Sequence, residues 1–332
     1  MVGRPILPPG LAERGSSQAR HRVRHGGEVP HLAGAAAFEL YSVEPSAIPV
    51  LIAVPHAGRS YSPALLERMR HPAQAALRLE DRLVDALGRA VAVATGASLL
   101  VAAAPRALID LNRACDDVDW EMVHPRGRSV PSDGAVRQQP SRRARSGLGL
   151  VPRRLPGLGE LWRRRLDPGE LEDRIAGVHA TYHAALAAEL ARLRARWGVA
   201  LLIDLHSMPP LEPREGEAGA AFVLGDRFGT TCSGALIASA FEWFGRAGEP
   251  AAHNRPYAGG YVLERHAAPQ AGFHAFQLEV DRARYLDSRL AELGDGFAPM
   301  VDLLAGLVKR LGDDVAALGR TQTRQHWSEA AE

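Results

Sequence analysis

The chain contains very little lysine and very little cysteine. Lys309 is the only lysine among 40 basic residues in a chain of 332, and Cys115 and Cys232 are the only cysteines. A Schiff-base enzyme or a Walker-type ATPase needs an active-site lysine, and Lys309 lies beside Arg310 near the end of a helical pattern. We therefore exclude both classes. Two cysteines are too few for a disulfide framework, which agrees with a reducing cytosol.

The sequence also lacks long apolar runs and a strong net charge. No uninterrupted run reaches transmembrane length, and the arginine-rich first thirty residues contain no hydrophobic segment of a secretory signal. The net charge is +2, so bulk electrostatics gives no reason to expect nucleic acid as a partner. With 46% hydrophobic residues the chain is predicted to fold. We expect a cytoplasmic protein with no membrane partner, and the oligomeric state stays open.

Short apolar runs alternate with longer helical patterns along the chain. Alternation of this kind predicts an α/β fold, a three-layer α/β/α sandwich with a mostly parallel central sheet. We expect residues 1–40 to form a flexible tail, 41–320 a single catalytic domain and 321–332 a C-terminal tail. The stretch 125–168, rich in Gly, Pro, Ser and Arg, is predicted to be a long loop. Strands are expected at 50–54, 98–103, 107–111, 200–205 and 272–280, and helices at 63–94 (broken at His71-Pro72), 170–197, 231–247 and 288–318.

Three predicted strands carry polar side chains at or near their carboxyl ends. His56 follows the first strand, His206 ends a buried strand, and Glu279 lies within an apolar strand pattern. In open α/β sheets ligands gather at this edge, and neutral imidazole is the commonest zinc ligand. A metal site is therefore plausible, although each histidine taken alone is more often structural. Asp110 and Asp204 precede other candidate residues by two positions and could orient them.

The order of several short motifs carries a family resemblance that covers roughly residues 45–290. The chain resembles the N-formylglutamate amidohydrolases, which are similar in fold to zinc carboxypeptidases and hydrolyse an amide next to a free carboxylate. The matching segments are Pro55-His56-Ala57-Gly58, Asp81-Arg82-Leu83, Pro105-Arg106, Asp110 to Arg113, Gly147 to Pro152, Tyr182-His183, Asp204 to Met208, Leu224 to Gly229, Gly259-Gly260-Tyr261, and Gln277-Leu278-Glu279 with Arg282 and Tyr285.

This resemblance implies a zinc ion held by three protein ligands. His56 and His206 are the expected histidine ligands, and the third ligand should be a carboxylate. In zinc carboxypeptidases it lies three residues after the first histidine, where this chain has Arg59, which cannot bind a metal. Asp81 is the preferred substitute, and Glu80 is the neighbour that must be excluded.

The resemblance also implies roles for residues around the zinc. Glu279 is expected to act as the general base, although it could instead be a strand glutamate paired with Arg282 or Arg284. Arg106 is expected to stabilise the oxyanion. Arg113, with Asn112 beside it, is expected to clamp a substrate carboxylate. Two further residues complete the predicted substrate site: Arg282 for a second carboxylate, and Tyr261 as a cover.

The predicted function is zinc-dependent hydrolysis of an N-acyl acidic amino acid. N-formyl-L-glutamate, giving formate and glutamate, is the expected substrate, and the formyl group rests on the resemblance alone. Two alternatives remain open. One is a related N-acyl amino acid hydrolase or carboxypeptidase-like enzyme that accepts a larger acyl group. The other is a metal-free binding protein for an acidic ligand on the same fold.

Overall fold

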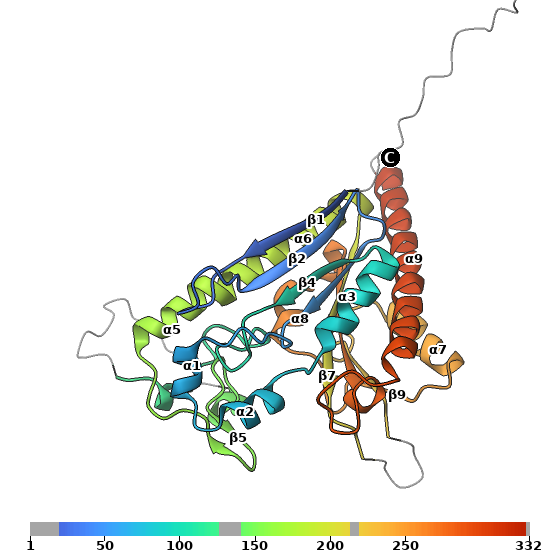
Figure 1. The fold of residues 1–332 in the computed structure, drawn as a ribbon. Coiled ribbons are helices and arrows are strands. Elements are labelled where there is room, and N and C mark those ends of the chain that lie inside the picture. The colour runs from blue at the N-terminus through green and yellow to red at the C-terminus, as the bar shows by residue number, and fades with distance from the viewer. Residues whose placement is uncertain (1–19, 126–140, 213–218, 330–332) are drawn as a thin grey trace, which may run out of the picture.

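The computed structural model describes residues 20–125, 141–212 and 219–329, with side chains described up to residue 321. In this part of the chain, one large sheet is covered by helices on both faces (Figure 1). The predicted α/β/α sandwich is thereby confirmed.

Eight strands form the central sheet in the order β1-β2-β4-β3-β7-β10-β8-β9. The pairs β4–β3, β3–β7, β7–β10 and β8–β9 are parallel, and the other pairs are antiparallel. A separate small hairpin is made by β5 and β6. The strands are β1 Arg20–Gly26, β2 Phe38–Glu44, β3 Val50–Val54, β4 Ser98–Ala102, β5 Arg154–Leu155, β6 Gly159–Glu160, β7 Ala200–Met208, β8 Phe222–Gly225, β9 Ala251–His253 and β10 Phe273–Asp281.

Helices connect most of the strands. The α-helices are α1 Pro63–Arg68, α2 Pro72–Leu79, α3 Val84–Thr95, α4 Arg142–Arg145, α5 Pro168–Arg174, α6 Thr181–Trp197, α7 Gly234–Arg246, α8 Tyr261–His266 and α9 Phe297–Glu329. A π-helical turn, η2 Ile175–Ala180, joins α5 to α6, and the short 3-10 turns are η1 Trp120–Met122, η3 Pro269–Ala271 and η4 Arg282–Arg284.

The two faces of the sheet bury different sets of helices. Because side chains alternate along a strand, Val50, Ile52 and Val54 of β3 face one core while Leu51 and Ala53 face the other. The first core contains residues of α3, α7 and α9. The second contains residues of α1, α2, α6 and α8.

Local sequence signals explain several helix ends. Ser62 caps α1 by accepting a hydrogen bond from the Leu65 N–H, and Pro63 occupies the first turn. Pro72 starts α2, which confirms the predicted break at His71-Pro72. Gly198 ends α6 at a φ of 78°, a left-handed conformation that glycine adopts without strain.

Both predicted tails are wrong in part. Residues 20–26 form β1, which pairs antiparallel with β2, so the domain begins well before residue 41. This strand carries charged, exposed side chains, typical of a sheet edge, and it lacks the apolar alternation on which the prediction depended. Residues 1–19 lie outside the described residues. At the other end, α9 continues to Glu329, so most of 321–332 is helical and not a tail.

Two further predictions need correction. Residues 107–111 form no strand. The first two belong to a turn closed by a hydrogen bond from the Leu108 N–H to the Pro105 carbonyl, and the apolar side chains of the stretch are buried in the core without sheet pairing. The predicted long loop 125–168 contains α4, the β5–β6 hairpin and the start of α5. Its central residues 126–140 lie outside the described residues.

No helix in the described part of the chain combines the length and the hydropathy that a membrane span requires.

Candidate metal centre and active-site cavity

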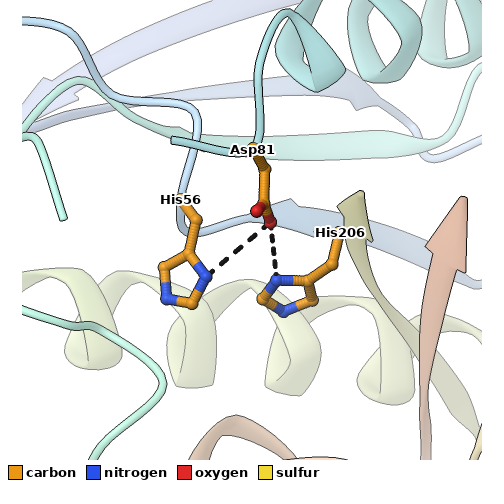
Figure 2. Close-up of side chains that lie close together, drawn as sticks. All are labelled: His56, Asp81 and His206. Atoms are coloured by element: carbon orange, nitrogen blue, oxygen red, sulfur yellow. Dashed lines mark hydrogen bonds and ion pairs between the residues drawn. The ribbon is translucent and has the colours of Figure 1, made fainter. Parts of the chain in front are cut away.

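Two histidines and one aspartate converge at the carboxyl edge of the sheet. His56 follows β3, His206 lies near the end of β7, and Asp81 lies between α2 and α3. Figure 2 shows both imidazole rings turned towards the Asp81 carboxylate. His206 Nδ1 is 2.9 Å and His56 Nδ1 is 3.7 Å from Asp81 Oδ2. Ligand atoms around a four-coordinate zinc, with bonds of about 2.0–2.2 Å, lie roughly 3.3 Å apart, so this spacing suits a metal.

Each histidine is oriented by a second carboxylate on its other ring nitrogen. His56 Nε2 lies 2.8 Å from Asp110 Oδ1, and His206 Nε2 lies 3.0 Å from Asp204 Oδ2. An ionised carboxylate can only accept, so each Nε2 donates to its aspartate, and each Nδ1 faces Asp81 with either a proton that Asp81 accepts or a lone pair that a metal ion can take. Carboxylate partners of this kind fix the tautomer of metal-binding histidines. Both aspartates that were expected to orient site residues are present. Asp204 contacts His206, two positions after it, whereas Asp110 lies on a loop and its side chain contacts His56.

The electrostatics of this cluster favour a bound cation. Burial opposes ionisation of Asp81, but hydrogen bonds from His206 and His56 outweigh it and hold the pKa of this carboxyl well below its usual value. Burial also disfavours the imidazolium of His206, yet Asp204 and Asp81 raise its pKa well above the usual value. A proton or a metal ion can supply the positive charge, and they compete for the same nitrogen. The three buried residues could therefore bind a metal.

Asp81 and its neighbour Glu80 have different partners in the structure. Although Glu80 is also buried, its carboxylate contacts the Arg82 guanidinium and lies outside the metal-binding group. Arg282 holds Asp81 in place: its Nη2 donates to Asp81 Oδ1 at 3.3 Å and to the Glu80 carbonyl at 2.7 Å, and its Nε donates to Ser207 Oγ at 3.0 Å. Arg282 was predicted to bind a substrate carboxylate, but these donors are engaged by the protein itself.

Glu279 lies beside the metal-binding group on the neighbouring strand. In the parallel β7–β10 ladder it pairs in register with His206, and its side chain is 6% exposed. Burial raises the pKa of its carboxyl to about 7. Gln277 Nε2 donates to Glu279 Oε1 at 2.7 Å, which leaves Oε2 without that constraint. The predicted pairing of Glu279 with Arg282 or Arg284 is not found.

These side chains open into a cavity of about 680 Å³. Arg106 and Arg113 both line it. Arg106 Nε donates to Asp110 Oδ2 at 2.9 Å, while Arg113 donates only to the backbone carbonyls of Leu148 and Asn112 among the described residues. Burial lowers the pKa of the Arg113 guanidinium. The cavity thus offers a half-buried guanidinium to which no carboxylate of the described residues is hydrogen-bonded.

Asn112 is near the site, but protein groups occupy its amide. Its Nδ2 donates to Gln277 Oε1 at 3.2 Å, and its Oδ1 accepts from the Val262 N–H at 2.9 Å. Gly260 permits this contact, since a Cβ there would lie 2.3 Å from Asn112 Oδ1. Asn112 thereby ties β10 to the start of α8, and it also lines the cavity, so its role in substrate binding stays a prediction.

A cluster of histidines supports the segment that carries Arg113. His183 Nε2 donates to the Leu111 carbonyl at 3.0 Å, and His179 Nε2 donates to the Arg113 carbonyl at 2.9 Å. His183 Nδ1 accepts from His266 Nε2 at 2.9 Å. The ring of Tyr261, predicted to cover the site, lines the cavity and stacks on His179. Tyr182 is fully buried in the core.

Sequence reasoning assigned no role to two residues at this site, Gln277 and Ser207. Gln277 bonds both Asn112 and Glu279, and Ser207 accepts from Arg282. The signal for Gln277 is its position two residues before Glu279, because residues at this spacing share a face of a strand. Ser207 offers no such signal, since it directly follows His206 and would be placed on the opposite face.

Comparison with known proteins gives a consistent result. The sequence model of the family "N-formylglutamate amidohydrolase" matches residues 48–286. A protein of Pseudomonas aeruginosa named N-formylglutamate deformylase is 30% identical over 293 residues, which is 85% of this chain and 98% of that protein. One of the same name from Pseudomonas putida is 28% identical over 72% of this chain and 82% of its own length.

A solved structure agrees with the sequence relatives. The crystal structure of N-formylglutamate amidohydrolase from Ralstonia eutropha matches with a TM-score of 0.75 at 30% identity, covering 85% of this chain and 99% of that one. Sequence, fold and the shared extent of the chains lead to one conclusion. The chain belongs to the N-formylglutamate amidohydrolase family.

Proposed function

We propose that this protein hydrolyses the amide of an N-formyl acidic amino acid, with N-formyl-L-glutamate as the substrate and formate and L-glutamate as the products. The observation that carries the proposal is the meeting of His56, Asp81 and His206 with the Glu279 carboxylate in one arginine-lined cavity. Family membership and the names of the relatives support the choice of substrate.

His56, Asp81 and His206 would hold a divalent metal, and we propose zinc. Two imidazole nitrogens and one carboxylate oxygen form a donor set typical of catalytic zinc sites, which keep a further position open. When bound, the metal would act as a Lewis acid on the amide carbonyl and make an attacking water more acidic. Asp110 and Asp204 keep the two imidazole Nδ1 lone pairs directed at it.

Glu279 would move the protons. Its carboxylate takes a proton from the attacking water as the new C–O bond forms, and it later gives a proton to the amine nitrogen as the C–N bond breaks. Gln277 holds Oε1, so Oε2 is the oxygen that exchanges the proton. A pKa of about 7 suits both steps near neutral pH, because a group of that pKa can accept and then release a proton.

Arginines would bind and orient the anionic substrate. Arg113 has a fork geometry suited to a carboxylate, and its neighbours within hydrogen-bond distance are backbone carbonyls, which leave the charge unpaired. Arg106 keeps its Nε on Asp110, which leaves its terminal nitrogens for the oxygen that becomes negative during attack.

The size of the cavity also favours the related alternative, an N-acyl amino acid hydrolase. A volume of about 680 Å³ leaves room for an acyl group larger than formyl. N-acetyl- and N-succinyl-L-glutamate are therefore the comparison substrates.

Formate release from N-formyl-L-glutamate by the zinc-loaded protein is the decisive assay. We expect its kcat/KM to exceed that for N-acetyl- and N-succinyl-L-glutamate by at least tenfold. Higher kcat/KM with either comparison substrate would replace the formyl assignment by the larger acyl group. Zinc-loaded protein that hydrolyses none of the three would refute the enzymatic proposal and favour a binding protein.

A further inference from the structure

A second cavity adjoins the segment 105–113, which also contributes to the lining of the first. It has a volume of about 570 Å³ and is lined by residues of α1, of α5 and of the stretch that precedes α5. These two helices lie near each other at one end of the molecule (Figure 1). Leu108 lines this cavity, whereas Arg106 and Arg113 line the first one. The two cavities therefore share a segment and differ in their linings.

Charged side chains of the second cavity are mostly basic. Those that line it are Arg68, Arg163, Arg164, Arg174, Glu67 and Glu170. Of the two glutamates, Glu67 is exposed and Glu170 is already shared by two arginines. An excess of positive charge is thus left around a partly enclosed space.

The most buried of these groups is the triad of Arg68, Glu170 and Arg174. Arg174 is 1% exposed; its Nη2 donates to Glu170 Oε1 at 2.5 Å and its Nη1 to the Leu108 carbonyl at 2.8 Å. Arg68 Nη1 donates to the other oxygen, Glu170 Oε2. Two guanidinium groups therefore share one carboxylate, and one positive charge is not balanced. An unbalanced buried charge is costly unless a counter-ion is present.

The hydrogen bonds of these two arginines also indicate that a partner is missing. Within the described residues, Arg68 Nε and Arg174 Nε are both buried and have no hydrogen-bond partner. Buried N–H groups are nearly always paired, so two unpaired donors on neighbouring arginines need an explanation. The Trp162 ring lies 5.7 Å from the Arg174 guanidinium carbon and restricts its movement. The Arg174 donor is therefore held in place.

We propose that this cavity binds a small dianion, a dicarboxylate or a phosphate, through the guanidinium groups of Arg68 and Arg174. Oxyanion oxygens accept strong hydrogen bonds from guanidinium N–H groups, and an anion in this cavity would balance the positive charge that Glu170 leaves uncompensated. Arg164, exposed at the rim, adds attraction without being needed for packing. Glu170 opposes the anion while it orients both arginines. The site is distinct from the substrate cavity and does not depend on the proposed reaction.

The proposal is tested by titrating malonate and inorganic phosphate separately into the full-length, metal-loaded protein by calorimetry. Binding of either probe is expected for the wild type. Arg68→Gln should weaken it at least tenfold, whereas Glu170→Gln should tighten it several-fold, because one change removes a positive charge and the other a negative one. The difference between the two probes identifies the preferred anion chemistry.

Three controls make the outcome specific. Arg310→Gln removes a partly buried arginine paired with Glu242 elsewhere and should leave the affinity unchanged. Arg113→Gln disables the substrate cavity and should also leave it unchanged. Arg164→Gln, at an exposed residue, should weaken binding several-fold even if Arg68→Gln does not fold. No binding of either probe, equal affinities in Arg164→Gln and Arg310→Gln, or binding lost only in Arg113→Gln would each overturn the proposal.

Discussion

At the scale of single residues, the candidate metal centre contains carboxylates of three kinds. Asp81 faces the imidazoles, Asp110 and Asp204 orient them from behind, and Glu279 lies beside them with a raised pKa. Four acidic groups of the same chemistry thus differ only through their hydrogen-bond partners and burial. Each role can therefore be tested by a charge-removing change of nearly equal shape.

Glu279→Gln should leave the metal content unchanged and lower kcat by about 10²–10⁴-fold, the range that general acid–base groups contribute. The amide keeps the size of the side chain but cannot take a proton. Zinc content and kcat are measured together on the same preparation. Loss of zinc from Glu279→Gln would show that Glu279 is a ligand instead.

Asp81→Asn should weaken zinc binding by at least about 100-fold, more than the loss of an orienting partner costs. The matched change Glu80→Gln should leave zinc affinity within a few-fold, because that carboxylate contacts Arg82. Competition with a chromophoric chelator measures both affinities. Equal losses in the two variants would contradict the assignment of Asp81 as the third ligand.

Arg113→Lys should raise KM for N-formyl-L-glutamate by about 10- to 100-fold, since hydrogen bonds to charged groups contribute about 1.5–3 kcal/mol and lysine cannot reproduce the fork. A smaller change in kcat is expected. Arg59→Lys, in an ion pair with Asp85 outside the metal centre, is the control. An unchanged KM in Arg113→Lys would refute its role as a carboxylate clamp.

Part of this site could be predicted from the residues themselves. His56, His206 and Glu279 follow from the position of polar groups at strand ends, a property that local sequence encodes. Asp81 does not, because it lies in a turn between two helices and its place depends on tertiary contacts such as the hydrogen bond from its N–H to the His56 carbonyl, 3.0 Å. For the same reason, the sequence could not indicate that Arg282 is engaged by Asp81 and Ser207.

At the scale of elements, the helix α6 and the π-turn before it hold the segment 111–113 through histidines. Burial lowers the pKa of His183 to about 2 and that of His266 to about 3, so both are neutral near pH 7. An unfolded histidine titrates near pH 6.5. Between that pH and the folded pKa values, only the unfolded state binds these protons. The stability contributed by the neutral pair is therefore complete above about pH 6.5 and is lost as the pH falls below it.

His266→Gln should make unfolding less sensitive to acid. Each buried neutral histidine lowers the free energy of unfolding by about 1.4 kcal/mol for every pH unit below 6.5. Between pH 7 and pH 5 the variant should therefore lose roughly 2 kcal/mol less than the wild type. Urea unfolding at both pH values measures the difference. Equal losses in the two proteins would mean that His266 is protonated in the folded state.

The elements also show where sequence patterns succeed and fail. The strands β3, β7 and β10 were predicted because they are buried on both faces and read as apolar runs. β1 was missed because an edge strand of arginine and histidine carries no apolar signal. Residues 107–111 were wrongly predicted to be a strand. Their apolar side chains are buried because they pack in the second core, and they take no part in the sheet.

At the scale of the whole molecule, the net charge is only +2, but arginines are concentrated around the two cavities. The first cavity is lined by several arginines, which would raise the local concentration of the proposed anionic substrate even though the molecule as a whole is nearly neutral. Nearly all the basic residues are arginine, but only those at the two cavities enter our proposals.

Removal of the metal should affect the whole molecule as well as the reaction. Protein treated with a chelator is expected to lose amidase activity and to recover it with added zinc. A ligand that binds only the folded state at 1,000 times its Kd stabilises it by about 4 kcal/mol, so zinc should also raise Tm. Scanning calorimetry with and without zinc checks this. A zinc-dependent rise of the same size in Asp81→Asn would place the metal elsewhere.

The register between β7 and β10 has a consequence for the durability of the catalytic geometry. Glu279 and His206 occupy paired positions on adjacent strands, and neighbouring strands lie about 4.8 Å apart. Their backbone separation is fixed by the hydrogen bonds of the sheet, independently of any loop. Insertions or exchanges in the surrounding loops can thus change which substrate is accepted while the spacing of the proposed base and the proposed ligand stays the same. Evolution can vary specificity here without rebuilding the chemistry.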